Sequence, residues 1–366
     1  MKCKLGDIAI VTMGQSPKGD TYNNNGEGMP FLQGNRTFGD RYPTFDTWTT
    51  APTKIAEAGD VIMSVRAPVG DLNITPVKMC LGRGVCSIRA NNGNQDFIFY
   101  LMKHSMGQLL SKESGTVFGS VNRTDINGLD VDIPEDSETQ RKIARYLAVI
   151  DEKIEANKQI NNNLEQQAQA LFRNQFLSQE TLPDGWTKAT LGEVSLMGAG
   201  GDKPKTVSAT QTENCPYPIY SNGISDEGLY GFTDEYKIKD ESITVSARGT
   251  IGFVCLRHIP YTPIVRLVTL IPNTDVLSAK YLYLWLKNSP IHGTGTTQQQ
   301  LTVPDFRKTE IVLPTKEEMD SFTDTVTPLF EAIWANQVEN TKLSNMRDVL
   351  LPKLMSGEFD VSEVVL

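Results

Sequence analysis

The sequence predicts an α+β protein in which two globular domains are separated by two long antiparallel helices that form a coiled-coil spacer. Three observations support this fold class: an internal repeat along the chain, short β-branched runs in each half, and an apolar stripe after each half. The predicted segments are domains at 1–135 and 181–314, helices at 136–180 and 315–357, and a C-terminal tail at 358–366.

The internal repeat indicates a duplicated module. Four stretches of the first half return in the same order in the second half, at an offset that drifts only between 179 and 186 residues. The pairs are 5–8 with 191–194, 59–66 with 241–248, 97–103 with 281–287, and 115–134 with 295–314. Ordered matches across the whole chain are the signature of a repeat architecture.

Each module is expected to mix short strands with one short helix. Residues 61–65 and 243–245 are short and β-branched, which is typical of strands. Residues 97–104 and 280–287 are rich in aromatic residues and leucine and contain no helix breaker, so we predict helices there. The glycine-rich run 198–201 lacks the strand-then-helix context of a dinucleotide site and is predicted to be a loop.

Each long helix begins with a predicted capping box, Ser137 with Gln140 and Thr315 with Glu318. In such a box, the hydroxyl and the side chain three residues later bond each other's exposed backbone N–H groups. Inside the second helix, Pro328 removes a backbone donor and is expected to kink the helix or delay its start.

Apolar residues in both helices recur at alternating spacings of three and four, which predicts a heptad seam. The seam residues are Ile143, Leu147, Ile150, Ile154, Asn157, Asn161, Leu164, Ala168 and Leu171, and then Phe322, Val326, Leu329, Ile333, Asn336, Asn340, Leu343, Arg347, Leu350 and Leu354. The paired asparagines favour two helices that pack on each other in a fixed register, so the second helix runs back and creates a pseudo-two-fold. The alternative is that each stripe packs on its own domain.

Composition is that of a globular protein of 366 residues with 39% hydrophobic residues and no apolar run long enough to span a membrane. Five cysteines at irregular spacing predict neither a disulfide framework nor a metal site, and a cytoplasmic location is expected. The net charge of −9 argues against a protein that binds nucleic acid through charge alone. The acidity is uneven, because residues 1–134 hold 13 basic and 13 acidic side chains, whereas residues 315–356 hold 4 and 7.

Motifs for catalysis are missing from the sequence. It contains no Gly-x-x-x-x-Gly-Lys phosphate loop, no Gly-x-Ser-x-Gly elbow, and no Asn-Pro-Pro-aromatic or Asp-Pro-Pro-aromatic run of amino-methyltransferases. The tripeptide 235–237 matches half of a nuclease Glu-x-Lys pattern but lacks an evident acidic partner upstream. The chain is therefore predicted to bind rather than to catalyse.

Polar and basic residues instead gather in loops at matching places of the two modules. Arg, Asn and Gln suit the edges of guanine and adenine, while Lys and Ser suit phosphates. The first set is Gln15, Ser16, Lys18, Tyr22, Gln33, Asn35, Arg36, Arg66, Arg83, Asn122 and Arg123. The second set is Lys203, Lys205, Ser221, Asn222, Arg248, Arg266, Thr296, Gln298, Gln299 and Gln300. Any single one of them is more often a solvated surface residue. Arg66 and Arg248 share a Ser-x-Arg context in which a structural role is as plausible as a DNA contact.

These residues resemble the specificity (S) subunit of type I restriction–modification enzymes. The resemblance covers the whole chain and is carried by the following stretches: GQSPKGDTYN (14–23), GMPFLQGN (28–35), AGDVIMSVRAPVGDLNI (58–74), GRGVCSI (82–88), IDEKIEANKQINNNLEQQAQALF (150–172), LPDGW (182–186), LGEVSLMGAGGDKPK (191–205), PIYSNGI (218–224) and LLPKLMSGE (350–358).

The resemblance implies a non-catalytic DNA-recognition subunit with two target-recognition domains, each of which reads one half of a bipartite double-stranded site. It implies that the helices set the spacing between the half-sites and dock two methyltransferase subunits, and that motor–nuclease subunits join for restriction. S-adenosylmethionine, ATP and Mg are then expected on those partners and not on this chain.

Two other functions are weighed against this one. A stand-alone nuclease or methyltransferase is disfavoured by the missing motifs, and assay of the purified chain with S-adenosylmethionine and DNA tests it. A coiled-coil scaffold without a DNA role is the other alternative. A salt-dependent gel shift tests it, because phosphate contacts weaken steeply with salt.

Overall fold

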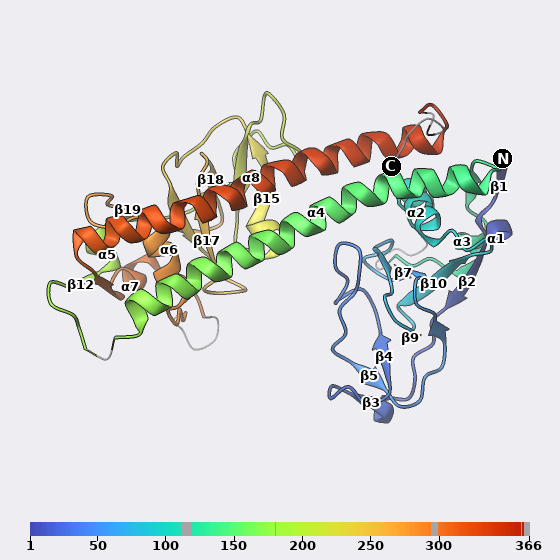
Figure 1. The fold of residues 1–366 in the computed structure, drawn as a ribbon, viewed down its shortest axis with the longest axis horizontal. Helices are drawn as coiled ribbons and strands as arrows, with labels where there is room; N and C mark the ends of the chain where they lie inside the picture. Colours follow the sequence, from blue (N-terminus) through green and yellow to red (C-terminus); the bar gives the residue numbers. More distant parts are fainter. Residues whose placement is uncertain (112–118, 180, 294–298, 360, 362–366) are drawn as a thin grey trace. The chain divides into compact units, whose positions relative to one another are not determined.

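The computed structural model describes residues 1–111, 119–179, 181–293, 299–359 and 361 (Figure 1). It divides into two compact units: unit 1 comprises Met1–Asn157 and Val338–Leu366, and unit 2 comprises Lys158–Gln337. Each unit therefore contains one globular module together with half of each long helix. The segments predicted from the sequence divide the chain at the helix ends instead, so they describe modules and helices separately.

In its described residues, unit 1 contains two small sheets, one strand pair and three helices beside the long ones. The four-stranded antiparallel sheet has the order β2 (Ala9–Met13), β10 (Val85–Ala90), β7 (Val61–Ser64) and β8 (Leu72–Ile74). The second sheet has the order β3 (Tyr22–Asn23), β5 (Trp48–Thr49), β4 (Met29–Leu32), β9 (Met79–Leu81) and β6 (Ile55–Ala56). The remaining elements are the pair β1 (Lys2–Lys4) and β11 (Asp130–Asp132), the helices α1 (Leu5–Ile8), α2 (Gln95–Leu110) and α3 (Arg123–Asn127), and a 3-10 turn at Gly19–Thr21.

Unit 2 repeats this arrangement. Its four-stranded antiparallel sheet has the order β13 (Ser195–Ala199), β19 (Val268–Pro272), β16 (Ser242–Val245) and β17 (Val254–Arg257). Its second sheet has three strands, β15 (Leu229–Thr233), β14 (Tyr217–Tyr220) and β18 (Thr262–Pro263). The remaining elements are the pair β12 (Thr187–Thr190) and β20 (Glu310–Leu313), the helices α5 (Leu191–Val194), α6 (Ala279–Lys287) and α7 (Val303–Phe306), and a 3-10 turn at Ser225–Gly228.

The duplication extends to single hydrogen bonds. The backbone N–H of Val121 donates to the carbonyl of Val65 at 3.2 Å, and in unit 2 Leu301 donates to Ala247 at 3.0 Å. The pairing of Ile88 in β10 with Val61 in β7 likewise returns in β19 and β16 at a constant offset of 182 residues. The two halves are therefore copies in backbone pairing as well as in sequence.

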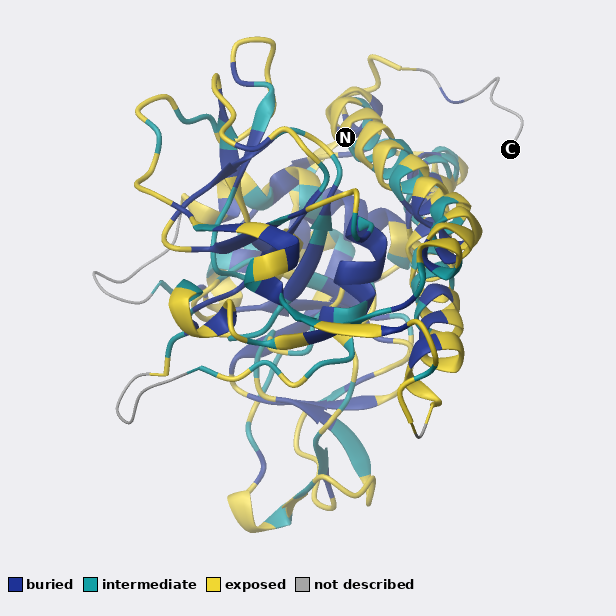
Figure 2. Cartoon of the chain, turned by 90° about the vertical axis from the view of Figure 1, so that its left-hand side faces the viewer, coloured by how far each residue is buried: buried dark blue, intermediate teal, exposed yellow. Residues whose placement is uncertain are grey.

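The predicted strands and helices of the modules are confirmed. Strands β7 and β16 contain only buried residues, which explains their continuous β-branched and apolar sequences. Helices α2 and α6 lie where aromatic and leucine residues were dense; α6 contributes most of its side chains to a core, and α2 contributes about half. Buried residues (dark blue in Figure 2) fill the interior, and exposed ones cover the loops. The run 198–201 is only partly a loop, because Gly198 and Ala199 end strand β13.

The long helices are α4 (Ser137–Phe172), followed by a π-helical turn at Arg173–Leu177, and α8 (Lys316–Met355). The capping box at α8 is confirmed, since Thr315 N–H donates to Glu318 Oε2 at 3.0 Å and Glu318 N–H donates to Thr315 Oγ1 at 3.4 Å. The box predicted at Ser137 is wrong. Asp136 caps α4 instead, because its carboxylate accepts the backbone N–H of Thr139 at 2.8 Å and anions are favoured at a helix N-terminus.

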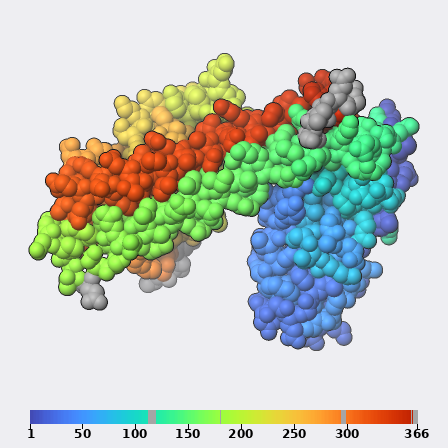
Figure 3. Space-filling view, in the orientation of Figure 1, coloured from blue at the N-terminus to red at the C-terminus, as the bar shows by residue number. Residues whose placement is uncertain are grey.

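Within each unit the two helices pack against each other in antiparallel directions (Figure 3). In unit 1, Asn157 Nδ2 donates to Asn340 Oδ1 at 2.9 Å, and Arg347 contacts Asp151 at 2.8 Å. In unit 2, Asn336 Nδ2 donates to Asn161 Oδ1 at 2.8 Å. As residue numbers rise in α4, the numbers of their partners in α8 fall, so the helices run antiparallel and the seam asparagines pair across them.

Burial of the predicted seam follows the heptad pattern for most positions. Leu147, Ala168, Val326 and Leu354 are fully buried, whereas Leu171 is 41% exposed. Phe172 occupies the core in place of Leu171, because a step of four residues from Ala168 stays closer to the 3.6-residue period than a step of three.

Pro328 lies inside α8, which begins at Lys316, so the proline does not delay the start of the helix. The helix continues through it, although Pro328 has no N–H to donate to the preceding turn. Helix α8 is therefore a single element over 40 residues. No helix of the described residues is both long and apolar enough to span a membrane.

Candidate nucleic-acid interface

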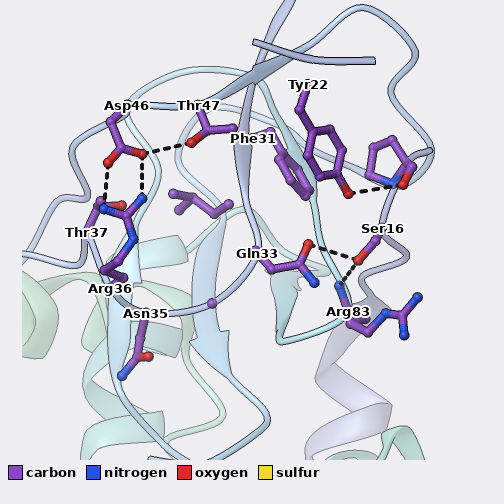
Figure 4. A pocket seen from close by; sticks show the side chains of 13 residues that line it. Ser16, Tyr22, Phe31, Gln33, Asn35, Arg36, Thr37, Asp46, Thr47 and Arg83 are labelled. Atoms are coloured by element: carbon purple, nitrogen blue, oxygen red, sulfur yellow. Dashed lines mark hydrogen bonds and ion pairs between the residues drawn. The ribbon is translucent and has the colours of Figure 1, made fainter. Parts of the chain in front are cut away.

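The loops at the tip of unit 1 enclose a pocket of about 660 Å³ (Figure 4). Its lining includes six residues of the predicted first set: Ser16, Tyr22, Gln33, Asn35, Arg36 and Arg83. They come from three segments that are distant in sequence and that strands β4 and β9 bring together, because β4 and β9 pair in parallel. The fold thus collects polar residues that the sequence left scattered.

Ser16 organises one end of this pocket. Its hydroxyl donates to Gln33 Oε1 at 3.0 Å and accepts the backbone N–H of Arg83 at 3.2 Å. Beside it, Tyr22 stacks on Phe31 with ring centroids 4.8 Å apart and donates its hydroxyl to the Pro17 carbonyl at 3.0 Å. The aromatic pair forms an apolar wall next to a fixed amide.

An ion pair lies at the other end. Arg36 contacts both carboxylate oxygens of Asp46, at 2.8 and 2.7 Å, and Thr47 donates its hydroxyl to the same carboxylate at 3.0 Å. Bonding from Arg36 holds the pKa of Asp46 below its usual range, and the carboxylate raises the pKa of Arg36. Both groups are exposed, so solvent screens the pair. Asp46 and Thr47 were not predicted, because Asp46 lies ten positions after Arg36 in a loop whose sequence shows no recognisable pattern.

Close backbone contacts explain the glycines of this region. A Cβ on Gly14 would lie 2.0 Å from the Gly82 carbonyl oxygen, and one on Gly84 would lie 2.3 Å from the Gln33 carbonyl oxygen. Three backbone segments can therefore meet only if these positions lack side chains. The GRG stretch at 82–84 is in this way explained by packing around Arg83.

The other predicted residues of unit 1 lie outside the pocket lining. Gln15, Lys18 and Arg66 are exposed, and the backbone of Arg66 bridges to Ser120. Asn122 has a structural role: it caps α3, and its Oδ1 accepts the N–H groups of Thr124 and Asp125 at 2.8 and 3.1 Å. Asn35, which does line the pocket, donates its amide to Asp71. Arg123 is exposed in the first turn of α3.

In unit 2, Asn222 joins two loops of the predicted second set. Its Nδ2 donates to the Val265 carbonyl at 2.6 Å, and its Oδ1 accepts the backbone N–H of Ala247 at 2.7 Å. Both ends of this amide are thus occupied by backbone, so Asn222 positions the loops that carry Arg248 and Arg266. Ser221 is half-buried beside it.

Arg248 is also partly tied into the structure. Its Nη2 donates to Gln300 Oε1 at 3.2 Å, while its Nε is buried with no hydrogen-bond partner among the described residues. Gln299, next to Gln300, is exposed. Thr296 and Gln298 lie outside the described residues. The shared context of Arg66 and Arg248 therefore leads to an exposed side chain in unit 1 and a half-buried one in unit 2.

The basic residues Lys203, Lys205 and Arg266 are exposed on unit 2. Lys203 Nζ lies 5.1 Å from the centre of the Tyr230 ring, a cation–π contact. The backbone of Arg266 has a φ of +60°, and that of Val265 has a φ of +52°. Such values are uncommon for residues other than glycine, and they cluster at binding sites.

A buried arginine that the sequence analysis did not identify supports these loops. Arg257 is 4% exposed, and it contacts Glu227 Oε2 at 2.9 Å and the Glu227 carbonyl at 2.6 Å. Its guanidinium lies 3.6 Å from the centre of the Tyr220 ring. It holds the turn at Asp226 and Glu227, whose φ values are +46° and +53°. Only its place in strand β17, opposite the turn, reveals this role.

Among the described residues no group of three His, Cys, Asp or Glu side chains is arranged to hold a metal ion, and the five cysteines are free. Burial raises the pKa of Cys86 and of Cys255 to about 12, which keeps these thiols protonated.

Known proteins share this sequence pattern. The family model of the type I restriction modification DNA specificity domain matches residues 1–166 and 183–343. The type I restriction enzyme MjaIX specificity subunit of Methanocaldococcus jannaschii is 25% identical over 99% of this chain and 94% of its own length. The putative MjaX specificity subunit of the same organism is 38% identical over 157 residues, which are 42% of this chain and 37% of that protein.

Solved structures agree on the fold. The crystal structure of a type I restriction–modification S subunit from M. genitalium matches with a TM-score of 0.60 and 18% identity, and the match covers 97% of this chain and 95% of that one. Specificity subunits are the non-catalytic components of restriction–modification complexes. Because the family model covers most of the sequence in two successive copies, the chain belongs to the type I restriction modification DNA specificity family.

Proposed function

We propose that each globular module reads one half of a bipartite double-stranded DNA site, so that the chain gives a type I restriction–modification complex its sequence specificity. The observation that carries this proposal is the duplicated loop cluster, which stands on matching strands of matching sheets in both units. Two copies of one framework with different side chains at matching positions recognise two different base sequences.

The chemistry of the exposed loop residues supports DNA contact. Arginine and glutamine fit base edges, and lysine fits phosphates. The exposed members of the predicted sets include Gln15, Lys18, Gln33, Arg66, Arg83, Arg123, Lys203, Lys205, Arg266 and Gln299. Those with bonded side chains, such as Asn122 and Asn222, are proposed to position the loops instead.

The two long helices are proposed to form a coiled-coil spacer that sets the distance between the half-sites. Antiparallel pairing in each unit supports a pseudo-two-fold relation between the modules, since it reverses the direction of one copy. Two opposed modules suit two half-sites on one face of the duplex about one helical turn apart.

The helices are further proposed to dock two methyltransferase subunits, which motor–nuclease subunits join for restriction. Large apolar side chains exposed on α4 and α8 support a protein partner there, including Val149 at 39%, Val338 at 52%, and Val349 at 59%. S-adenosylmethionine, ATP and Mg are proposed to bind to these partner subunits.

A paired heptad insertion tests the spacer. Residues 157 and 340 pair across the helices, as do 161 and 336, so seven residues inserted after Lys158 and seven after Val338 keep both pairs intact. The spacer lengthens by about 10 Å, or roughly 3 base pairs. Mapping methylated adenines in cells that express the variant should show unchanged half-sites with a longer gap. An unchanged gap would contradict the spacer function.

Exchange of one module tests the bipartite reading. Replacing residues 1–135 with those of another family member should change one half-site and leave the other half-site and the gap unchanged. Methylation mapping measures all three quantities together. A change in both half-sites would show that the modules do not read DNA independently.

A further inference from the structure

We propose that Gln33 and Arg83 of unit 1 read a guanine in the major groove, and that unit 2 uses Val265 at the position of Arg83 to contact a thymine methyl group. This inference rests on the proposed function, because it assigns base contacts within the two half-sites. It also predicts that the half-sites differ at one matching base pair.

The two sites correspond through their backbone hydrogen bonds. In unit 1 the N–H of Gly82 donates to the Leu32 carbonyl at 2.7 Å, and in unit 2 the N–H of Ile264 donates to the Tyr220 carbonyl at 2.9 Å. Both bonds continue a parallel strand pair, β4 with β9 and β14 with β18. The residues one step further along each strand therefore occupy matching positions. These are Gln33 and Arg83 in unit 1, and Ser221 and Val265 in unit 2.

Arg83 is held at its backbone and free at its side chain. The flanking N–H groups of Gly82 and Gly84 donate to the carbonyls of Leu32 and Gln33, at 2.7 and 3.0 Å, and its own N–H donates to Ser16. In the part of the chain that the structure describes, no carboxylate pairs with its exposed guanidinium. Arg36, in contrast, has its guanidinium occupied by Asp46, at the opposite end of the pocket (Figure 4).

Gln33 is oriented before any DNA binds. Because the Ser16 hydroxyl donates to Gln33 Oε1, the Nε2 end of the amide carries the remaining donors. Arg83 and Gln33 together present donors, and guanine is the base that presents two acceptors, N7 and O6, in the major groove. Adenine and cytosine each place an amino donor there, which opposes these groups.

Val265 of unit 2 has an apolar side chain, whereas Arg83 and Gln33 of unit 1 present hydrogen-bond donors. It is 49% exposed, although its backbone is held in place: its N–H donates to the Gly201 carbonyl at 2.9 Å, and its carbonyl accepts from Asn222 at 2.6 Å. A β-branched residue at a φ of +52° is strained, and such strain persists where surrounding bonds enforce it. The loop therefore presents an apolar side chain outward, and an apolar contact suits the C5-methyl group of thymine.

The test compares arginine variants in the assembled complex of this chain with its methyltransferase subunits. Binding to a library randomised at each half-site should show that Arg83→Ala loses guanine preference at one base pair of one half-site, by about 10- to 100-fold. Arg307→Ala is the control, because this exposed arginine at the end of α7 lies outside the predicted DNA-binding sets, and its base preferences should equal those of the wild type. Thermal unfolding of each complex verifies that the variants are folded.

Val265→Ala provides an independent arm in the other module. It should weaken thymine preference at the matching base pair of the second half-site and leave the first unchanged. A uniform loss of affinity for all sequences in Arg83→Ala, with a shallower salt dependence, would identify a phosphate contact and overturn the inference. Unchanged preferences in both variants would overturn it as well. Altered preferences in both half-sites from a single variant would instead contradict the proposed function.

Discussion

Units 1 and 2 hold the long helices on their modules with chemistry that differs in part. In unit 1, the Asp151 carboxylate of α4 accepts hydrogen bonds from Tyr100 Oη at 2.7 Å and from Arg347 Nη1 at 2.8 Å. The cationic groups of Arg41 and Lys103 lie 3.7 and 3.9 Å from the same carboxylate. In unit 2, Phe172 of α4 packs on Phe176, Tyr281, Trp285 and Phe322, with ring centroids 5.3 to 6.4 Å apart. Unit 2 also has a carboxylate at this junction, since Glu165 of α4 accepts a hydrogen bond from Tyr283 Oη at 2.6 Å and pairs with Lys287 at 3.0 Å, so what distinguishes unit 2 is the aromatic cluster around Phe172.

The difference shows that a duplicated backbone does not require duplicated side-chain chemistry. The two junctions join equivalent elements, a module helix and both long helices, and both are closed to solvent. Burial opposes the charge of Asp151, yet Lys103, Arg347 and Tyr100 together lower its pKa. Removal of one charged partner leaves the other charges buried without compensation. Removal of an aromatic ring leaves a cavity instead.

Phe322→Ala should have the largest effect, because it empties the centre of the aromatic junction. Phe322 is 2% exposed, and truncation of a buried phenylalanine costs about 3–5 kcal/mol. Denaturant unfolding of the full chain measures the loss, and hydrogen exchange should locate it in unit 2. Leu171→Ala, at a position that is 41% exposed, is the control and should change stability by less than about 0.5 kcal/mol. Equal effects of the two variants would contradict the aromatic junction.

Asp151→Asn should destabilise unit 1 by about 3 kcal/mol, because the change leaves three cationic side chains facing one another without a carboxylate. The side chain of Asp151 is 10% exposed, whereas that of Asp348, which also bonds Arg347, is 64% exposed. Asp348→Asn is therefore the matched control, with an expected loss below about 1 kcal/mol. The protection of unit 2 against hydrogen exchange should be the same in both variants. A loss in unit 2 would show that the junctions are not independent.

The two asparagine pairs differ in burial, which predicts unequal losses. Asn157 is 1% exposed and donates to both Asn340 and Glu339, at 2.9 and 2.6 Å, while Asn161 is half-buried. Asn157→Ala should cost about 1–2 kcal/mol, since it removes two hydrogen bonds made from a buried position, and Asn161→Ala should cost less than about 1 kcal/mol. Denaturant midpoints compare them directly, and the opposite order would refute the ranking by burial.

Between pH 6.5 and about 4, a buried histidine should make the stability of unit 2 depend on pH. His258 stacks on Trp334 of α8, with ring centroids 4.1 Å apart, and burial, aided by Arg257 and Lys280, lowers its pKa from 6.5 to about 4. Between these values the unfolded chain binds more protons, so stability falls as the pH is lowered from 6.5 to 4. His258→Phe keeps a ring on Trp334 and should flatten this slope. His104→Phe, at an exposed site, should retain it, and an unchanged slope in His258→Phe would exclude His258 as its source.

The sequence predicted much of the fold because its signals are local and repeated. The strands at 61–65 and 243–245, the helices at 97–104 and 280–287, and the box at Thr315 all depend on neighbouring residues, and the structure confirms them. The prediction at Ser137 failed because Asp136, one residue earlier, also caps and carries a favourable charge.

The candidate site was predictable only as a set of residue types. Nothing in the sequence distinguishes Arg36 from Arg83, yet Asp46 occupies the first and none of the described carboxylates pairs with the second. Likewise, both ends of the Asn222 side-chain amide bond backbone groups. Asn222 therefore supports the loops, although the sequence predicted that it contacts DNA. Partners of this kind come from loops that are distant in sequence and carry no periodicity.

By itself, the sequence determined that this protein is a duplication with two modules and two long helices, because the repeat and the heptad spacing depend only on the order of residues along the chain. The tertiary structure decided which loop positions of the two modules correspond, since strand pairing matches Gln33 with Ser221 at an offset of 188 residues, outside the drift of 179 to 186 in the sequence repeat. It also decided that the carboxylate at the helix junction of unit 2 is accompanied by an aromatic cluster around Phe172. These are contacts between distant segments, whose free energy depends on burial and geometry that no local pattern encodes.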